Sequence, residues 1–395
     1  MVRGLGGGVK PGFKRVFSVL LLIVLTLSIL LFATAAPSER VAVIVGFKQA
    51  PDLQLLKAHG GEVSYVCKYV PAVAVSLPPA AVEALRRNPN VAYVEPDFEV
   101  HLVPLAKPGP PPQPAETVPW GVERIGAPKV WKSYTGSGVK VAVLDTGIDV
   151  KHPDLRVAGG ASFVKGSKSY SDDNGHGTHV AGIIAALDNE IGVVGVAPDA
   201  ELYAVKVLNR QGSGFISWVV AGIEWSISNE MQVISMSLGS TSDSTTLHDV
   251  ITLAYSRGIV LVAAAGNSGP GEDTVEYPAK YGEVIAVGAT DANNEIASWS
   301  SRGSELELAA PGVSIYSTYK GGTYATLSGT SMACPHVTGT VALILQKNPG
   351  LTPNEVRGIL RGSAVDLGSE GWDSTYGYGL VNAFEAVENT PQPSP

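Results

Sequence analysis

Three short segments carry the residue types that a hydrolytic site needs. Asp145 ends the apolar run Val141–Leu144, His176 stands between two glycines, and Ser331 follows a Gly-Thr pair. A serine hydroxyl is a weak nucleophile and needs a base within hydrogen-bond reach. An imidazole base needs a buried carboxylate that fixes its tautomer and stabilises its cation. Taken together, these residues predict nucleophilic catalysis by an Asp-His-Ser triad.

Each segment alone has other interpretations. Asp145-Thr146-Gly147 also fits an aspartic peptidase, but that class needs two such loops and the sequence has one. His176 and His179 could bind zinc, but the glutamate of a His-Glu-x-x-His motif is missing. The glycines around His176 weakly match a dinucleotide-binding loop, although no strand precedes them. Ser331 alone could be an ordinary helix N-cap. The triad is favoured by the three segments together.

In this chain order the segments resemble the subtilisin family of serine endopeptidases, a family for which this order is known. The resemblance runs from about Thr117 to Val387. It implies a secreted endopeptidase of broad specificity that works through an acyl-enzyme intermediate and is made as an autoprocessed zymogen. The other matching segments are Val118–Gly121, Tyr203–Leu208, Ser235–Gly239 and Ala264–Asn267.

The resemblance also implies a substrate site. Asn267 would donate its side-chain N–H to the oxyanion of the tetrahedral intermediate, with the backbone N–H of Ser331 as the second donor. Glycine-containing edges would pair with an extended substrate as added strands. The residues expected to line this site are Gly212, Ser213, Gly214, Ser237, Leu238, Gly239, Ala264, Ala265, Gly266 and Glu276.

Glu276 is the unusual member of that set. It aligns with the base of the pocket for the residue before the cut, where relatives often carry glycine. A carboxylate that points into this pocket would favour a basic substrate side chain. A carboxylate that points into solvent would have no effect, so the sequence leaves both outcomes open.

Calcium is the cofactor that the resemblance implies. Oxygen ligands in the expected number suit Ca²⁺ better than Mg²⁺. The expected ligands are the side chains of Glu116, Asp154 and Asn189 and the backbone carbonyls of Leu187, Ile191 and Val193. A weaker cation site, or simply solvated carboxylates, is expected around Ala279, Tyr281, Val284, Glu305 and Glu307.

The surrounding pattern predicts the elements that position these residues. Apolar runs of strand length alternate with helical stretches, which indicates an α/β fold with a mostly parallel central sheet and helices on both faces. Active sites of such sheets lie outside the carboxyl ends of the strands. The strands are expected at 140–144, 201–207, 233–236, 260–264 and 284–289, and the helices at 176–187, 217–229, 246–257 and 331–346.

The N-terminal third has a different organisation. Arg3, Lys10, Lys14 and Arg15 precede the apolar run 16–32 and a small-residue site, which predicts a signal peptide rather than a retained anchor. A βαββαβ pattern of ferredoxin-like α+β type follows, with its last strand at 91–100. The expected divisions are a signal peptide at 1–36, a propeptide at 37–103, a Pro-rich linker and processing region at 104–116, a catalytic domain at 117–389 and a tail at 390–395.

Composition limits the partners. The chain has 28 Lys and Arg against 36 Asp and Glu, and this excess of acid argues against nucleic acid as a partner. Its two cysteines, Cys67 and Cys334, are too few for a disulfide framework, and Cys334 is expected to be buried without a catalytic role. The expected partners are protein and peptide substrates and the propeptide as inhibitor. The chain should be a secreted monomer, without stable membrane association once the signal peptide is removed.

Two other classes of protein remain as alternatives. One is a catalytically inactive binding protein on the same fold, which should have lost a triad residue or Asn267, and none is lost. The other is a storage complex whose propeptide stays bound after cleavage.

Overall fold

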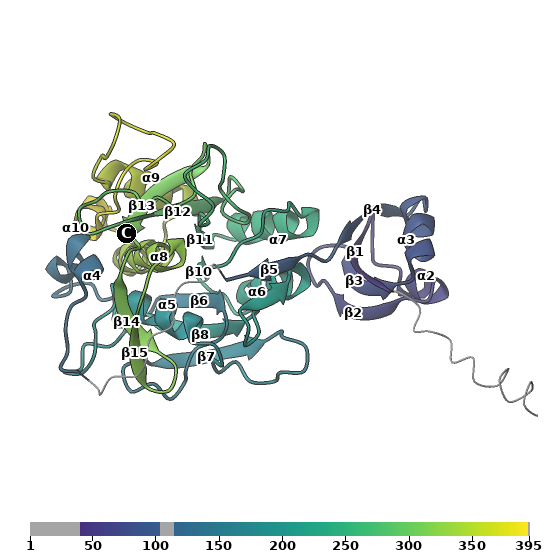
Figure 1. Cartoon of the computed structure of the whole chain (residues 1–395), viewed down its shortest axis with the longest axis horizontal. Helices are drawn as coiled ribbons and strands as arrows, with labels where there is room; N and C mark the ends of the chain where they lie inside the picture. Colours follow the sequence, from purple (N-terminus) through teal and green to yellow (C-terminus); the bar gives the residue numbers. More distant parts are fainter. Residues whose placement is uncertain (1–39, 103–113, 394–395) are drawn as a thin grey trace, which may run out of the picture.

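The N-terminal part of the chain forms a small unit of its own in the computed structural model, which describes residues 40–102 and 114–393 (Figure 1). Its four-stranded sheet has the order β2-β3-β1-β4, and neighbouring strands are antiparallel. The element order confirms the expected βαββαβ pattern. The elements are β1 Val41–Phe47, α2 Leu53–Ala58, β2 Glu62–Val66, β3 Ala72–Leu77, α3 Pro79–Arg86 and β4 Val91–Pro96.

A seven-stranded sheet organises the larger unit. Its order is β13-β12-β11-β10-β6-β8-β7, and all neighbouring pairs are parallel. The expected α/β architecture is therefore confirmed. The strands are β6 Lys140–Asp145, β7 Val157–Ser162, β8 Glu201–Lys206, β10 Val233–Met236, β11 Val260–Ala264, β12 Val284–Thr290 and β13 Leu306–Pro311.

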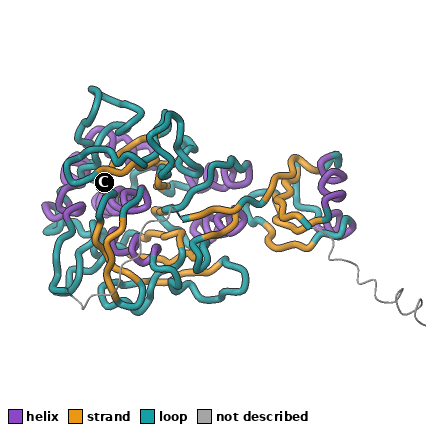
Figure 2. Tube along the Cα trace, in the orientation of Figure 1, coloured by secondary structure: helices purple, strands orange, loops and turns teal. Residues whose placement is uncertain are grey.

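Helices cover both faces of this sheet, and Figure 2 shows them around its strands. Val141 and Val143 of β6 belong to one apolar cluster, whereas Ala142 and Leu144 belong to another, because successive side chains of a strand point to opposite faces. The helices are α4 Trp120–Arg124, a 3-10 helix η1 at Ala127–Lys129, α5 His176–Ala185, α6 Ile216–Ser228, α7 Thr245–Ser256, α8 Thr330–Lys347, α9 Pro353–Ser363 and α10 Ala383–Asn389.

One expectation about the small unit is wrong. Residues 91–100 do not form a single strand, because the chain leaves the small sheet after Pro96 and pairs with the large unit instead. Asp97 marks the break, since its carboxylate accepts hydrogen bonds from the backbone N–H and hydroxyl of Ser217 at 2.9 and 2.7 Å. The next strand, β5 Glu99–His101, pairs antiparallel with β9 Ser213–Phe215. A hairpin of β14 Ile315–Tyr319 and β15 Thr323–Leu327 completes the larger unit.

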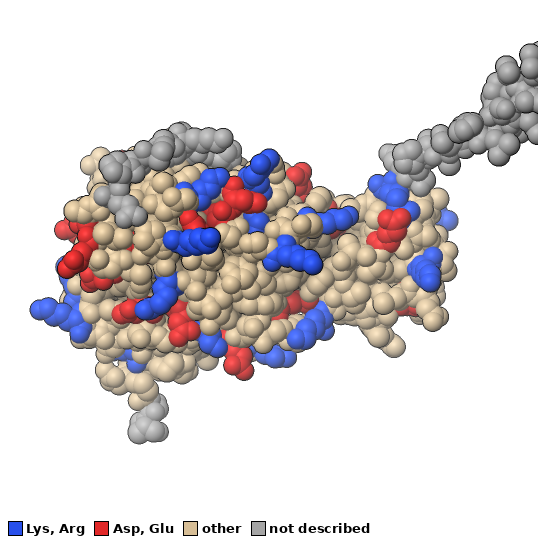
Figure 3. All heavy atoms as spheres, turned by 90° about the horizontal axis from the view of Figure 1, so that it is seen from below, with Lys and Arg blue, Asp and Glu red and all other residues tan. Residues whose placement is uncertain are grey.

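The expected termini and linker fall partly outside the described residues. The proposed signal peptide lies wholly outside them, as do most of the linker and the last two residues of the tail. Within residues 40–102 and 114–393, no helix combines the length and apolar character needed to cross a membrane. On the face drawn in Figure 3, basic and acidic side chains are interspersed, and no continuous basic surface covers it.

Candidate active site

Asp145 and His176 lie together at the carboxyl end of the central sheet. Asp145 ends β6 and is fully buried, and His176 is the first residue of α5. The Nδ1 atom of His176 is 2.9 and 3.0 Å from the two carboxylate oxygens of Asp145. The Nε2 atom of His176 is buried and has no hydrogen-bond partner among the described residues. With Nδ1–H donated to Asp145, Nε2 is free to accept a proton.

Ser331 lies one residue into α8, at a buried position. Its hydroxyl donates to the backbone carbonyl of Ser237 at 3.2 Å, and the hydroxyl of Ser237 donates to the carbonyl of Ser331 at 3.0 Å. The Ser331 hydroxyl is thus bonded to Ser237 and not to His176. Hydrogen bonds of a catalytic site are often incomplete without substrate, and this geometry keeps Ser331 in place beside the end of β10.

Asn267 follows β11 and is oriented by Thr330, the residue before Ser331. Its side-chain oxygen accepts hydrogen bonds from the backbone N–H and the hydroxyl of Thr330 at 3.0 and 2.8 Å. The side-chain Nδ2 is buried and has no partner within the described part of the chain. A buried donor without an acceptor is costly, so its presence points to an acceptor that arrives with a ligand.

Strand β5 of the small unit occupies the groove between the two expected substrate edges. Val100 pairs with Gly214, and Leu102 N–H donates to the carbonyl of Gly212 at 2.7 Å. On the other side, His101 exchanges backbone hydrogen bonds of 3.4 Å with Gly239. The segment therefore lies between residues 212–214 and Gly239 and is hydrogen-bonded to both sides, as an extended substrate would be.

Glu276 is half-buried and lies between Gly239 and Gly266, two of the residues expected to line the substrate site. A Cβ added to Gly239 would be 2.5 Å from Glu276 Oε2, and one added to Gly266 would be 2.8 Å from its carboxyl carbon. Its Oε1 accepts a hydrogen bond from the hydroxyl of Ser268 at 2.8 Å. Glu276 therefore points into the gap between the ends of β10 and β11, not away into solvent.

The residues of the expected calcium site also come together. Asp154 is fully buried, its Oδ2 accepts from Val193 N–H at 3.0 Å, and its Oδ1 has no partner among the described residues. Burial raises the pKa of Asp154 to about 7. Glu116 Oε1 accepts from the backbone N–H groups of Asn189 and Glu190 at 2.6 and 3.0 Å. Residues 115 and 117 pair with 191 and 193, so the end of the expected linker lies against this loop.

These observations fit a cation held by oxygen atoms. An ionised Asp154 would bury an oxygen that lacks a donor, and a bound cation would satisfy it. Within the part of the chain that is described, no group of three or more His, Cys, Asp and Glu side chains could hold a metal ion. The expected site is of another kind, since three of its six ligands are backbone carbonyls.

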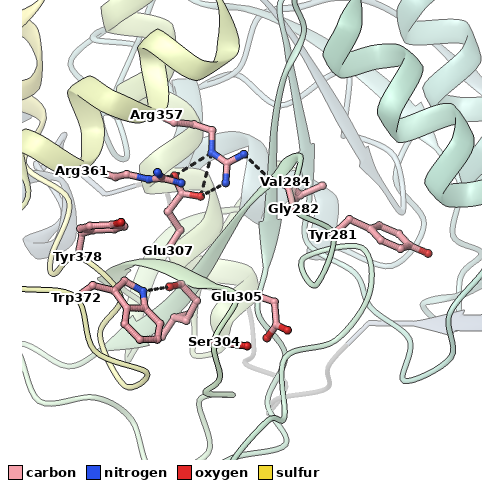
Figure 4. A pocket seen from close by; sticks show the side chains of 11 residues that line it. Tyr281, Gly282, Val284, Ser304, Glu305, Glu307, Arg357, Arg361, Trp372 and Tyr378 are labelled. Atoms are coloured by element: carbon pink, nitrogen blue, oxygen red, sulfur yellow. Dashed lines mark hydrogen bonds and ion pairs between the residues drawn. The ribbon is translucent and has the colours of Figure 1, made fainter.

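The weaker cation site is not supported at Glu307. Figure 4 shows Glu307 held by two guanidinium groups. Its oxygens accept from Arg357 Nε at 3.0 Å and from Arg361 Nε at 2.9 Å, and Arg357 Nη1 donates to the carbonyl of Gly282 at 2.6 Å. Glu307 is only 3% exposed, so it is neither a free cation ligand nor a solvated carboxylate. Both alternatives left open by the sequence are wrong for this residue.

Two contacts that position the site were not anticipated, although Ser237 itself was expected to line the substrate site. Thr330 fixes the amide of Asn267, and Ser237 holds the Ser331 hydroxyl through its backbone carbonyl. The expectation for Cys334 is confirmed, because it is a buried free thiol, 3.7 Å from the hydroxyl of Ser235. Burial raises the pKa of Cys334 to about 11, which keeps the thiol protonated and unreactive.

This fold and this arrangement of aspartate, histidine and serine are those of a serine peptidase, and comparison with known proteins gives the family. Residues 136–379 match the family model described as "Subtilase family", and residues 42–97 match the one described as "Fervidolysin N-terminal prodomain". The chain belongs to the subtilase family and is a serine endopeptidase with an N-terminal prodomain.

Three relatives illustrate the extent of the similarity. Subtilisin E of Bacillus subtilis is 51% identical over 356 residues, which cover 87% of this chain and 90% of the relative. An alkaline protease of Shouchella clausii is 52% identical over 319 residues, which cover 80% of each chain. Subtilisin Savinase of Lederbergia lenta is 56% identical over 274 residues, which cover 69% of this chain and all of the relative.

Proposed function

We propose that this chain is a secreted, calcium-stabilised zymogen of a broad-specificity endopeptidase in which Ser331 is the nucleophile. The observation that carries the proposal is the pairing of His176 Nδ1 with a buried Asp145, which leaves Nε2 without a partner among the described residues. The proposed layout is a signal peptide at 1–36, a propeptide at 37–103, a linker at 104–116 and a catalytic domain at 117–389.

The chemistry follows from the placement of these groups. Ser331 Oγ attacks the scissile carbonyl carbon while His176 Nε2 takes the hydroxyl proton. Asp145 keeps the imidazole oriented and stabilises its cation. The negative oxygen of the tetrahedral intermediate accepts hydrogen bonds from Asn267 Nδ2 and Ser331 N–H. Collapse of the intermediate breaks the C–N bond, and the amine leaves with the proton held by His176.

Deacylation repeats these steps with water. His176 Nε2 takes a proton from a water molecule, whose oxygen attacks the acyl ester at Ser331. The second tetrahedral intermediate collapses to a carboxylic acid and returns the proton to Ser331 Oγ. The partnerless Nδ2 of Asn267 supports its role, because the amide is already oriented by Thr330 and needs no reorganisation when charge develops.

The position of β5 supports both substrate binding and inhibition by the propeptide. His101 lies opposite Gly239, and the two segments run antiparallel. In a substrate bound in the same register, the residue two positions after the one opposite Gly239 would lie opposite Ser237, whose backbone carbonyl accepts a hydrogen bond from the Ser331 hydroxyl. A substrate bound in the register of His101 therefore presents a peptide bond to Ser331. The same register makes the propeptide a competitor for the groove and brings the junction after it to the nucleophile, so that cleavage in cis is expected.

Calcium would be held by Glu116, Asp154 and Asn189 with the carbonyls of Leu187, Ile191 and Val193. It would supply positive charge to two carboxylates that otherwise repel each other, and it would order the loop 187–193. These ligands lie outside the triad, so the ion contributes stability and not a step of the reaction.

The deciding experiment uses the full-length precursor with Ser331→Ala. We expect this variant to fold and to remain at full length, whereas the wild-type precursor yields a mature enzyme that hydrolyses casein and is blocked by a serine-directed inhibitor. Ser328→Ala, three residues earlier in the chain, serves as the control and should mature normally. N-terminal sequencing of the product locates the cut.

Each alternative gives a different result. Processing of purified Ser331→Ala would contradict the autocatalytic mechanism. A wild-type chain that neither matures nor hydrolyses casein would be an inactive binding protein. A chain that is cut but never hydrolyses casein would be the storage complex.

A further inference from the structure

Asp172, which the mechanism does not use, accepts five hydrogen bonds. Its Oδ1 accepts from the hydroxyl of Thr146 and from the backbone N–H groups of Asn174 and Gly175, each at 2.9 Å. Its Oδ2 accepts from the N–H and the hydroxyl of Thr178 at 3.0 and 2.6 Å. Burial raises the pKa of Asp172, and these hydrogen bonds oppose that rise. Each of these hydrogen bonds stabilises the ionised carboxylate, but burial outweighs them and the pKa stays above its usual value.

The hydrogen bonds join the two turns that carry the catalytic pair. Thr146 follows Asp145, and its backbone N–H donates to Asp145 Oδ1 at 2.7 Å. The hydroxyl of Thr146 donates to Asp172 and accepts from Gly177 N–H, next to His176, at 3.0 Å. The two turns also touch directly, since a Cβ added to Gly177 would lie 2.1 Å from the carbonyl oxygen of Gly147.

Asp172 also stabilises the beginning of the helix that His176 starts. The residue before the helix is Gly175, which has no side chain to cap the free N–H groups of the first turn. Side chains outside the helix accept them instead: Asn174 accepts from His176 N–H at 3.2 Å, Thr146 from Gly177, and Asp172 from Thr178. A carboxylate at this end is also favoured by the helix dipole.

We propose that Asp172 is a positioning residue that holds His176 in register with Asp145, acting through Thr146 and the first turn of α5. The inference rests on the proposed function, because it assumes that His176 is the base. Displacing a catalytic group by about 1 Å can reduce turnover about a hundredfold. Loss of Asp172 should therefore lower kcat while KM, which depends on the edges 212–214 and 237–239, stays nearly constant.

The test compares Asp172→Asn and Asp172→Ala with the wild-type protein. Values of kcat are expressed per active site, titrated with a serine-directed reagent, at a temperature well below unfolding. Asparagine can keep the three hydrogen bonds to Oδ1, so we expect kcat to fall about tenfold with Asn and about a hundredfold with Ala. KM should change by less than about twofold.

A matched control is Asp373→Asn. Asp373 also accepts hydrogen bonds from three backbone N–H groups, those of Ser369, Thr375 and Tyr376, but it lies in a loop outside the site. This variant should unfold at a lower temperature with unchanged kcat. If Asp172→Ala shows the same behaviour, with kcat within twofold of wild type, Asp172 stabilises the fold and does not position the site.

A second variant covers the case in which Asp172→Ala does not fold. Thr146→Val removes the hydroxyl that links the two turns but leaves the Asp172 bonds to α5. It should also lower kcat and slow self-cleavage of the precursor. In the double variant with Asp172→Asn, kcat should fall by less than the product of the two single losses, because the two residues act as one unit. Full activity of Thr146→Val would refute the inference. The proposed function is tested separately by Ser331→Ala. If that variant is inactive, the proposed function stands even when the inference about Asp172 is refuted.

Discussion

Glu276 offers a direct test of what this site selects. Glu276→Gln removes the negative charge from the gap between Gly239 and Gly266 but keeps the volume of the side chain. Its amide oxygen can still accept the hydrogen bond from Ser268 that the carboxylate accepts at 2.8 Å. Glu276→Gly removes both the charge and the bulk. The two variants therefore separate electrostatic from steric selection.

The expected magnitude follows from the contacts of the carboxylate. One oxygen is bound to Ser268, and the other lies against Gly239, where a substrate side chain would enter. A hydrogen bond to a charged partner contributes about 1.5–3 kcal/mol, roughly twice a neutral one. Losing the difference, about 1.4 kcal/mol, corresponds to about a tenfold change. We expect Glu276→Gln to lower kcat/KM for an Arg substrate about tenfold and to leave Phe and Leu nearly unchanged.

Glu276→Gly should act on both kinds of substrate. The side chain packs against the Cα positions of Gly239 and Gly266, so its removal deepens the gap. A large apolar side chain gains roughly tenfold where space for one or two further methylene groups opens, since each contributes about 1 kcal/mol or more. The ratio of kcat/KM for the Arg peptide to kcat/KM for the Phe peptide should thus fall further than in Glu276→Gln.

The assay measures kcat/KM for peptides that differ only in the residue before the cut, which is Phe, Leu or Arg. Glu272→Gln, an exposed change of charge in the same stretch of chain, controls for long-range electrostatics and should leave all three values unchanged. If the ratio of Arg to Phe is the same in wild type, Glu276→Gln and Glu276→Gly, Glu276 is not part of the pocket.

Two further predictions concern metal and propeptide. Excess chelator should lower the unfolding temperature on the order of 10 °C while turnover at moderate temperature stays nearly constant, because a ligand at a thousand times its Kd stabilises by about 4 kcal/mol. Asp154→Asn should abolish this effect, and an unchanged melting curve in chelator would exclude the proposed site. The propeptide should bind at least tenfold more weakly in Glu224→Ala, because buried Glu224 accepts from Tyr65 OH and from the N–H groups of Lys68 and Tyr69. The measurement is the lag before activity appears after self-cleavage, which weaker binding should shorten. An unchanged lag would contradict the proposed role of Glu224 in holding the propeptide.

The sequence predicted the central strands well because their signal is strong. Buried parallel strands appear as continuous apolar runs, and 233–236 and 260–264 were located to the residue. The edge strands were not predicted. Val157–Ser162 contains two glycines, and Leu306–Pro311 contains Glu307, so neither segment appears as a continuous Val, Ile or Leu run. Glu307 is accommodated there only because two distant arginines bind it.

The residues of the candidate site also fall into those that the sequence indicated and those that it did not. Residues that belong to recognisable motifs, such as Asp145, His176 and Ser331, were found from the sequence. Asp172 and Thr330 were not, because a hydrogen-bond acceptor or donor has no periodic signature and its partners come together only in the folded chain. The Asp-Asp-Asn-Gly stretch before His176 was the one available signal, since acidic and amide side chains near a helix start often cap it.

The contacts of the small unit indicate that cutting the chain is not enough to release the enzyme. Beyond the strand in the groove, Glu95 accepts hydrogen bonds from Thr245 and Thr246 at the start of α7, and Asp97 accepts from Ser217 at the start of α6. A carboxylate at a helix N-terminus satisfies N–H groups that lack partners in the helix and is favoured by its dipole. None of these bonds depends on the covalent link at residues 103–113. We therefore expect cleavage to leave the propeptide bound, so that activity appears only when the propeptide is itself degraded.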